Sequence, residues 1–205
     1  MILAIDVSHR IGLMSLELED GRILSLSSDK PREHLEFLQS GLVRLEAESG
    51  LKWASLKRTA VTLGPGSFTG LRVGLATLKG LIFGTDIPLL PLSSLSIPAL
   101  AAGLDTPRVV IRRARIQTYW TGFFEPGESA TQEEYLLEEA DLLHRLATLR
   151  TARPGLIILG DAQDALGELD LQPEPGRDRQ IAALAELAKG NRGLVSDADL
   201  DLLLP

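Results

Sequence analysis

The chain has 205 residues, of which 44% are hydrophobic and 24% charged, a globular composition that excludes extensive disorder. Its formal net charge of −7 argues against a protein that binds nucleic acid unaided. It contains no cysteine, which excludes disulfides, thiolate catalysis and cysteine-based metal sites.

The charge is unevenly distributed along the chain. Residues 1–103 carry ten basic and ten acidic side chains, whereas residues 104–205 carry eleven and eighteen. No stretch approaches the roughly 18 unbroken apolar residues of a membrane helix. The N-terminus does not resemble a signal peptide, because it has no basic segment and its first apolar run ends at Asp6. We therefore expect a cytoplasmic protein without a membrane segment.

The first half predicts three strands followed by alternating helices and strands. Glu19-Asp20-Gly21 has the composition of a hairpin turn between two of the strands. Leucines at helical spacing indicate the first helix. The predicted strands are Ile2–Val7, Ile11–Leu18, Arg22–Ser27, Thr59–Leu63 and Pro88–Leu92, and the predicted helices are Glu33–Glu48, Gly70–Phe83 and Ser94–Ala102.

The second half repeats this order, although no residue-level repeat is visible. Its predicted strands are Arg108–Ala114, Thr118–Phe124, Glu134–Leu137 and Gly155–Leu159, and its predicted helices are Asp141–Leu149, Gln163–Glu168 and Arg179–Lys189. Alternating strands and helices predict an α/β protein with mixed sheets covered by helices. Two βββαβα halves, residues 1–103 and 104–205, suggest the duplicated fold of the actin, sugar-kinase and Hsp70 (ASKHA) group.

The glycine-rich segment Gly64–Arg72 links a predicted strand to a helix N-terminus. Its spacing fits neither a Walker loop nor a nucleophile elbow. One interpretation is a tight turn in which Ser67 or Thr69 caps the helix. The alternative is an anion or nucleotide site, because helix N-termini carry unsatisfied N–H groups. The candidate residues for that site are Asp6, Ser8, Gly66, Ser67 and Thr69.

The helix after this segment has an unusual stripe of mostly small residues. Each mid-helix glycine costs about 1 kcal/mol relative to alanine, so several in one helix need a packing reason. The stripe comprises Gly70, Gly74, Thr77, Leu81 and Gly84. It indicates close packing either on the protein's own sheet or against a partner helix, and we favour the partner.

No catalytic constellation is evident, and we predict no catalytic residue and no metal site. The three histidines, His9, His34 and His144, show no metal-binding spacing. The segment Arg112–Phe124 contains both arginines and aromatic residues, a combination that can bind RNA. We expect its aromatic side chains to be core. The candidate RNA-contacting residues are Arg112, Arg113 and Arg115.

Three segments carry a resemblance to the bacterial TsaB (YeaZ) family. They are Ile2–Ser8, Gly64–Gly80, and Pro88-Leu89 leading into Ser93-Ser94-Leu95, and His34 also resembles a histidine that often opens the family's first helix. The resemblance covers roughly the first hundred residues. The chain departs from the family at Val7, at Arg112–Tyr119, where an acidic residue is missing, and in its short C-terminal tail.

The resemblance implies the ASKHA fold and a role in making threonylcarbamoyl-adenosine in tRNA. It implies a non-catalytic paralogue that dimerises with the transferase TsaD, with TsaE joining the complex, with tRNA contacted only indirectly and with no cofactor of its own. Whether ATP binds at the partner interface stays open. The interface residues implied by analogy are His34, Leu38, Leu42, Leu45, Phe68, Arg72, Leu75, Ala76, Lys79 and Phe83.

Three alternatives to this role remain at the level of the sequence. One is a nucleotide-binding phosphotransferase of the ASKHA type that uses Asp6 and the glycine-rich loop. Another is a peptidase, although no nucleophile–base pair is evident. The last is a homodimer formed through the same two helices.

Overall fold

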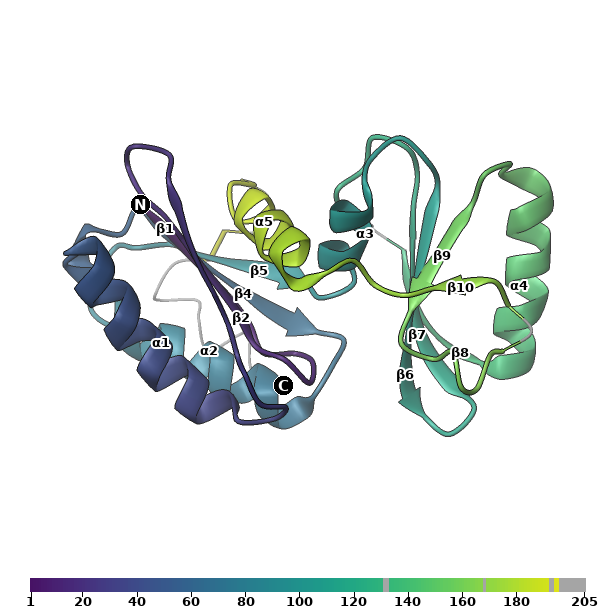
Figure 1. Ribbon diagram of the computed structural model, residues 1–205, viewed down its shortest axis with the longest axis horizontal. Coiled ribbons are helices and arrows are strands. Elements are labelled where there is room, and N and C mark those ends of the chain that lie inside the picture. The colour runs from purple at the N-terminus through teal and green to yellow at the C-terminus, as the bar shows by residue number, and fades with distance from the viewer. Residues whose placement is uncertain (131–132, 168, 192–193, 196–205) are drawn as a thin grey trace. The chain divides into compact units, whose positions relative to one another are not determined.

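The computed structural model describes residues 1–130, 133–167, 169–191 and 194–195. These residues form two compact units, which we describe separately. The first unit contains Met1–Ser94 together with the segment that begins at Arg177, and the second contains Leu95–Gly176. Figure 1 shows the elements of each unit.

The first unit is built on a five-stranded mixed sheet with the strand order β3-β2-β1-β4-β5. Strand β1 pairs antiparallel with β2 and parallel with β4. The strands are β1 (Ile2–Asp6), β2 (Leu13–Glu17), β3 (Ile23–Ser27), β4 (Arg58–Gly64) and β5 (Leu89–Ser93). Strand β3 lies at one end of this sheet, so it pairs only with β2.

Helices cover both faces of this sheet. Helices α1 (His34–Ser49) and α2 (Phe68–Ile82) are in contact with each other on one face, and α5 (Arg177–Leu187) lies on the other (Figure 1). A short 3-10 helix, η1 (Trp53–Ser55), precedes β4. The main core lies beneath α1 and α2 because alternate side chains of the central strands, such as Leu3 and Ile5, point to that face.

The second unit has a sheet with the order β10-β9-β6-β7-β8. Its strands are β6 (Arg108–Arg115), β7 (Thr118–Phe124), β8 (Glu134–Glu138), β9 (Ile157–Gly160) and β10 (Leu171–Gln172). Helix α4 (Glu139–Ala152) contributes Leu142 and Leu146 to one apolar cluster. Helix α3 (Ser96–Ala102) contributes Ala99 to a second cluster, which contains Val110 of β6.

The two sheets have the same topology, which confirms the predicted fold class. Numbered within its own unit, each sheet runs third, second, first, fourth, fifth strand. In each, the first strand pairs antiparallel with the second and parallel with the fourth. The protein is therefore an α/β protein with the duplicated ASKHA fold.

The structure divides the chain differently from the predicted boundary after residue 103. Helix α3 follows β5 but belongs to the second unit, and α5 follows β10 but belongs to the first. The physical reason is apolar burial, because Ile181, Leu184 and Leu187 of α5 are buried and the helix contacts β1, β2 and β3. Each half therefore supplies one helix to the other half's unit.

One local prediction was also wrong, and one short strand was not predicted. The predicted helix Gln163–Glu168 consists of turns in its described residues: Ala165 N and Leu166 N both donate to Ala162 O, and Leu169 N donates to Leu166 O. Glu168 itself lies outside the described residues. The two-residue strand β10 had no sequence signal, because it is recognised only by its pairing with β9.

None of the helices in the described ranges is long and apolar enough to cross a membrane.

Candidate functional site

The glycine-rich loop packs directly on the turn that follows β1. Ser67 N donates to Ser8 O at 2.7 Å, and a Cβ on Gly66 would lie 2.3 Å from that same oxygen. Ser94 holds the loop from its other side, donating from its Oγ to Pro65 O and from its N to Gly64 O. The loop is therefore tied to the protein's own backbone on two sides.

Asp6 and Ser67 have local structural partners. The buried Asp6 carboxylate accepts from Ser8 N at 2.9 Å and from Thr62 Oγ1 at 2.7 Å, which joins the ends of β1 and β4. Ser67 is the N-cap of α2, and its Oγ accepts from Gly70 N at 3.2 Å. This confirms the capping interpretation with Ser67 as the cap, while Thr69 is exposed in the first turn. Anion binding here stays a prediction.

Two buried polar groups lie beside this turn. Within the described part of the chain, neither Ser8 Oγ nor His34 Nδ1 has a hydrogen-bond partner. Burial lowers the pKa of His34, and the charge of Asp6 opposes this effect. His34 is only 7% exposed, so the structure places it against the core and not on the outer surface of α1.

The glycines of α2 correct our preference for a partner helix along the small-residue stripe. A Cβ on Gly70 would lie 2.0 Å from Val7 O, and a Cβ on Gly74 would lie 2.8 Å from Val7 Cγ2. These two residues are glycine because the helix approaches the end of β1 too closely for a side chain. The first two residues of the stripe therefore pack against the protein's own sheet, whereas Gly84 is exposed.

The predicted interface residues divide into three groups by exposure. Leu38, Leu45 and Leu75 are buried in the core of the first unit, so together with His34 they are not surface residues. Their apolar character reflects packing on the sheet. Leu42 and Lys79 are partly buried. The exposed members of the predicted set are Phe68, Arg72, Ala76 and Phe83.

The predicted interface set omitted two exposed apolar residues of α1. Leu35 is 51% exposed, and Val43, which lies off the row of leucines at helical spacing, is 68% exposed. On α2, Phe68 is 59% exposed, Arg72 stacks over its ring at 3.9 Å, and the C-cap residue Phe83 is 81% exposed. We call the residues Leu35, Val43, Phe68, Ala76 and Phe83 the helix face.

The arginine cluster is largely engaged within the second unit. Arg112 is 4% exposed, and its Nε and Nη2 donate to the two carboxylate oxygens of Glu174, both at 3.1 Å. Arg113 pairs with Asp164 at 2.9 Å. Arg115 is exposed and lies 3.4 Å from Thr118 Oγ1. Arg112 is therefore too buried for the predicted RNA contact.

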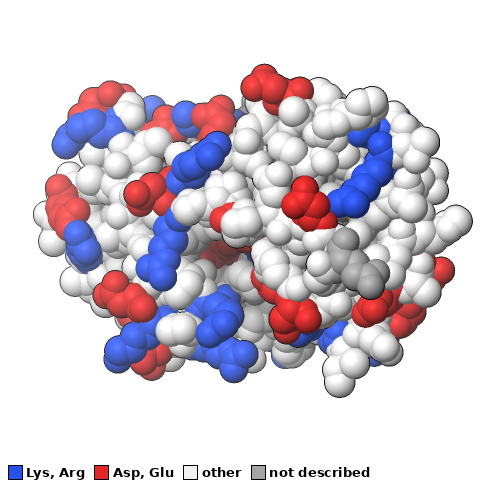
Figure 2. Space-filling model, turned by 45° about the vertical axis from the view of Figure 1, so that its right-hand side comes forward, with Lys and Arg blue, Asp and Glu red and all other residues white. Residues whose placement is uncertain are grey.

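Two aromatic side chains of this region are core, as expected, because Tyr119 and Phe124 are fully buried, whereas Trp120 and Phe123 are partly exposed. Acidic and basic side chains are interspersed on the face drawn in Figure 2. In the described ranges, no group of three or more histidine, aspartate or glutamate residues has an arrangement that could hold a metal ion.

Comparison with known proteins gives a family. The model of the TsaD family, described as tRNA N6-adenosine threonylcarbamoyltransferase, matches residues 28–164. A protein named tRNA threonylcarbamoyladenosine biosynthesis protein TsaB from Haemophilus influenzae is 36% identical over 101 residues, which are 49% of this chain and 42% of that protein. The protein of the same name from Escherichia coli is 26% identical over 160 residues, 76% of this chain and 64% of that protein.

A solved structure, YeaZ from Pseudomonas aeruginosa, shows the same fold with a TM-score of 0.75 and 23% identity. That match covers 97% of this chain and 96% of YeaZ, whereas this chain spans only 42% and 64% of the lengths of the two TsaB relatives. The chain belongs to the TsaD family, and its matches to TsaB proteins place it in the TsaB (YeaZ) branch of that family.

Proposed function

We propose that this protein is a non-catalytic subunit that pairs with the TsaD transferase in making threonylcarbamoyl-adenosine in tRNA. The helix face is the surface through which it does so. Membership of the TsaB branch supports the pathway, because the relatives are named for threonylcarbamoyladenosine biosynthesis. The observation that carries the pairing is the exposure of large apolar side chains on α1 and α2.

Among the described residues, these side chains are covered only in part by their own unit. Val43 is 68% exposed and Phe83 81% exposed, although helices of a single domain normally turn such residues inward. A cluster of exposed apolar residues is typical of a protein–protein contact. Because α1 and α2 contact each other on one face of the sheet, a partner's helices would cover both together (Figure 1).

The packing around Asp6 supports a non-catalytic role. In an ASKHA protein that used a nucleotide, the turn after β1 and the glycine-rich loop would wrap phosphates. Here Ser67 N donates to Ser8 O, and Asp6 Oδ1 accepts from Ser8 N and Thr62 Oγ1. Two backbone N–H groups and one carboxylate oxygen that could meet a phosphate or a metal-bound water are therefore engaged within the protein.

Purified protein mixed with the TsaD of the same organism tests the pairing. We expect a one-to-one complex at micromolar concentration by size exclusion with light scattering. Ala76→Arg and Val43→Arg should each weaken it at least about tenfold, because each buries a charge in an apolar contact. Ile116→Arg is the matched control, since Ile116 is 87% exposed but lies in the second unit. A complex unaffected by both helix variants would refute the proposed surface.

Further measurements separate the competing hypotheses. Calorimetry with ATP and Mg²⁺ on the isolated chain should show little binding, whereas micromolar binding would favour a phosphotransferase. A homodimer through the same helices should dissociate as TsaD is titrated in. Addition of TsaE with and without ATP then tests whether TsaE joins the pair and whether the nucleotide is required at the interface.

A further inference from the structure

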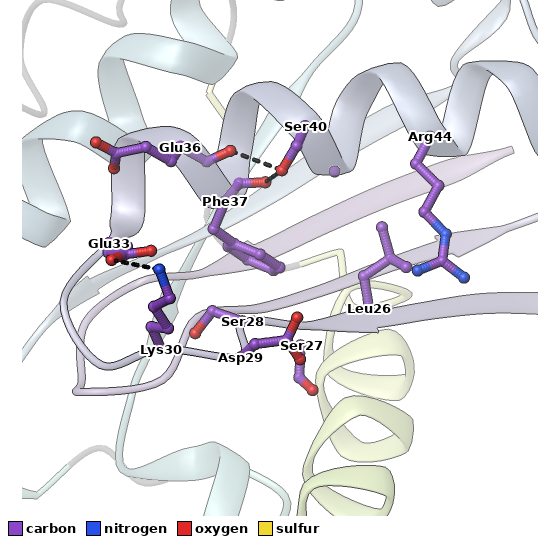
Figure 3. A pocket seen from close by; sticks show the side chains of 11 residues that line it. Leu26, Ser27, Ser28, Asp29, Lys30, Glu33, Glu36, Phe37, Ser40 and Arg44 are labelled. Carbon is purple, nitrogen blue, oxygen red and sulfur yellow. Dashed lines mark hydrogen bonds and ion pairs between the residues drawn. The ribbon is translucent and has the colours of Figure 1, made fainter.

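A groove of about 340 Å³ lies in the first unit between α1 and the end of β3 (Figure 3). Strand β3 is the outermost strand on this side of the sheet. No residue of the helix face lines the groove. Its lining residues are Leu26, Ser27, Ser28, Asp29, Lys30, Glu33, Glu36, Phe37, Ser40, Gly41 and Arg44.

The free edge of β3 presents backbone groups beside this groove. Ser28 N donates to Gly12 O and Leu18 N donates to Arg22 O, so even-numbered residues of β3 face β2. In an antiparallel ladder the intervening residues direct N–H and C=O the other way. The N–H and C=O of Ser25 and Ser27 therefore point to the free edge, where a further strand would find them.

The groove has an apolar floor and an acidic excess along its rim. Leu26 and Phe37 are largely buried beneath it, and Gly41 adds no side chain. Lys30 pairs with Glu33 at 3.3 Å, and Arg44 pairs with Glu48 at 2.6 Å. The two remaining charged groups of the lining, both carboxylates, have no ion-pair partner among the described residues. They are Asp29 and Glu36.

We propose that this groove binds an extended, basic peptide segment of a partner protein. The segment adds to β3 as a sixth strand, bonding to the outward N–H and C=O of Ser25 and Ser27. Every second side chain of that strand points to the face covered by α1. On this face an apolar side chain lies over Leu26 and Phe37, and a lysine or arginine two positions along the segment lies toward Asp29 and Glu36. Charge complementarity selects a basic segment, and the free strand edge selects an extended one.

A fluorescein-labelled peptide that repeats valine-threonine-lysine-threonine is the probe, because its valines and lysines share one face of a strand. Binding is followed by anisotropy. Ser27→Pro removes one outward N–H without touching the bonds between β2 and β3, and it should weaken binding about tenfold. Ser27→Ala keeps that N–H and should bind like the wild type. Glu36→Lys should weaken binding by a similar factor, because it reverses the charge that attracts the peptide.

Two control peptides separate strand addition from attraction to the acidic chain. A peptide of the same sequence with alternate backbone nitrogens methylated should not bind, nor should one that repeats valine-threonine-glutamate-threonine. Nuclear magnetic resonance should show that the Ser25 and Ser27 amide signals shift with the probe. Equal affinity for the methylated peptide, or unshifted Ser25 and Ser27 amides at saturation, would overturn the proposal.

Separate controls exclude misfolding of the variants and an effect of the TsaD-pairing surface on peptide binding. The melting temperature of Ser27→Pro shows whether the variant folds. If the variant does not fold, the methylated peptide tests strand addition on the wild-type protein instead. Val43→Arg should leave peptide binding unchanged. The experiments can therefore refute peptide binding at the groove without refuting the pairing with TsaD, and they can refute the pairing without refuting peptide binding.

Discussion

At the scale of single residues, two glycines of α2 differ in the space available for a side chain. A Cβ on Gly70 would lie 2.0 Å from the backbone oxygen of Val7, whereas a Cβ on Gly80 would meet nothing within 4 Å. We expect Gly70→Ala to lower the free energy of unfolding by about 1–3 kcal/mol, because α2 must move off the end of β1. Urea denaturation measures this.

The matched control is Gly80→Ala, which should raise the free energy of unfolding by about 0.5–1 kcal/mol through helix propensity alone. If both substitutions stabilise the protein, the close approach of α2 to Val7 is not present in solution.

His34 makes the stability depend on pH. Burial lowers its pKa in the folded protein below the usual imidazole value, so the unfolded chain binds a proton more readily. Its contribution to stability is complete above a pH of about 6.5 and is lost as the pH falls from there through the lowered folded pKa. Melting temperatures measured between about pH 7.5 and 5 should therefore fall less steeply in His34→Gln than in the wild type. Parallel curves for the two proteins would contradict this.

At the scale of elements, Arg58 holds the end of α5 on the first unit. Its guanidinium donates to the carbonyl oxygens of Ala188, Lys189 and Gly190 and to Asn191 Oδ1. Carbonyl groups at a helix C-terminus lack partners within the helix, and a cation there is favourable. Arg58→Ala should therefore cost about 1–2 kcal/mol of stability and speed hydrogen exchange in α5.

Lys57→Ala is the control for this substitution. Lys57 is adjacent, but its ion pair with Glu19 at 3.4 Å is exposed, so its loss should change stability by less than about 0.5 kcal/mol. Exchange in α5 that is equally fast in both variants would show that Arg58 does not anchor this helix.

Most elements could be predicted because their signals are local. The apolar run of β1 and the leucine spacing of α1 are consequences of the faces that these elements bury. The surface of α1 could not be predicted in the same way. Leu35 and Leu38 are both among the leucines at helical spacing that predict α1, but Leu38 is fully buried and Leu35 is half exposed. The position of α2 beside α1 decides this, and it is set by contacts distant in the sequence.

At the scale of the whole molecule, the negative charge is concentrated in the second unit. Residues 95–176 carry thirteen acidic and seven basic side chains, so the rest of the chain is nearly neutral. The helix face lies in the nearly neutral unit. Its apolar contact with TsaD should be little affected by salt, because screening acts on exposed charges. We expect the Kd to change less than about threefold between about 50 and 500 mM NaCl.

If charge drove the pairing, the Kd would depend strongly on the salt concentration. Titration by calorimetry at the two salt concentrations distinguishes the two cases, with Ile116→Arg again as the control for charge added away from the helix face. A Kd that rises about tenfold or more with salt would mean that ion pairs, and not the apolar residues, hold the complex.

The sequence by itself determined the class of fold, most of the strands and helices and the resemblance to the TsaB family, and it limited the cap of α2 to Ser67 or Thr69. These depend on periodicity and on short motifs, which neighbouring residues set. Only the tertiary structure decided that Ser67 is the cap and that Leu35 and Val43 remain exposed. It also decided that α5 returns to the first unit and that Arg112 is buried against Glu174. The last two depend on contacts with residues more than thirty positions away, which no local pattern contains.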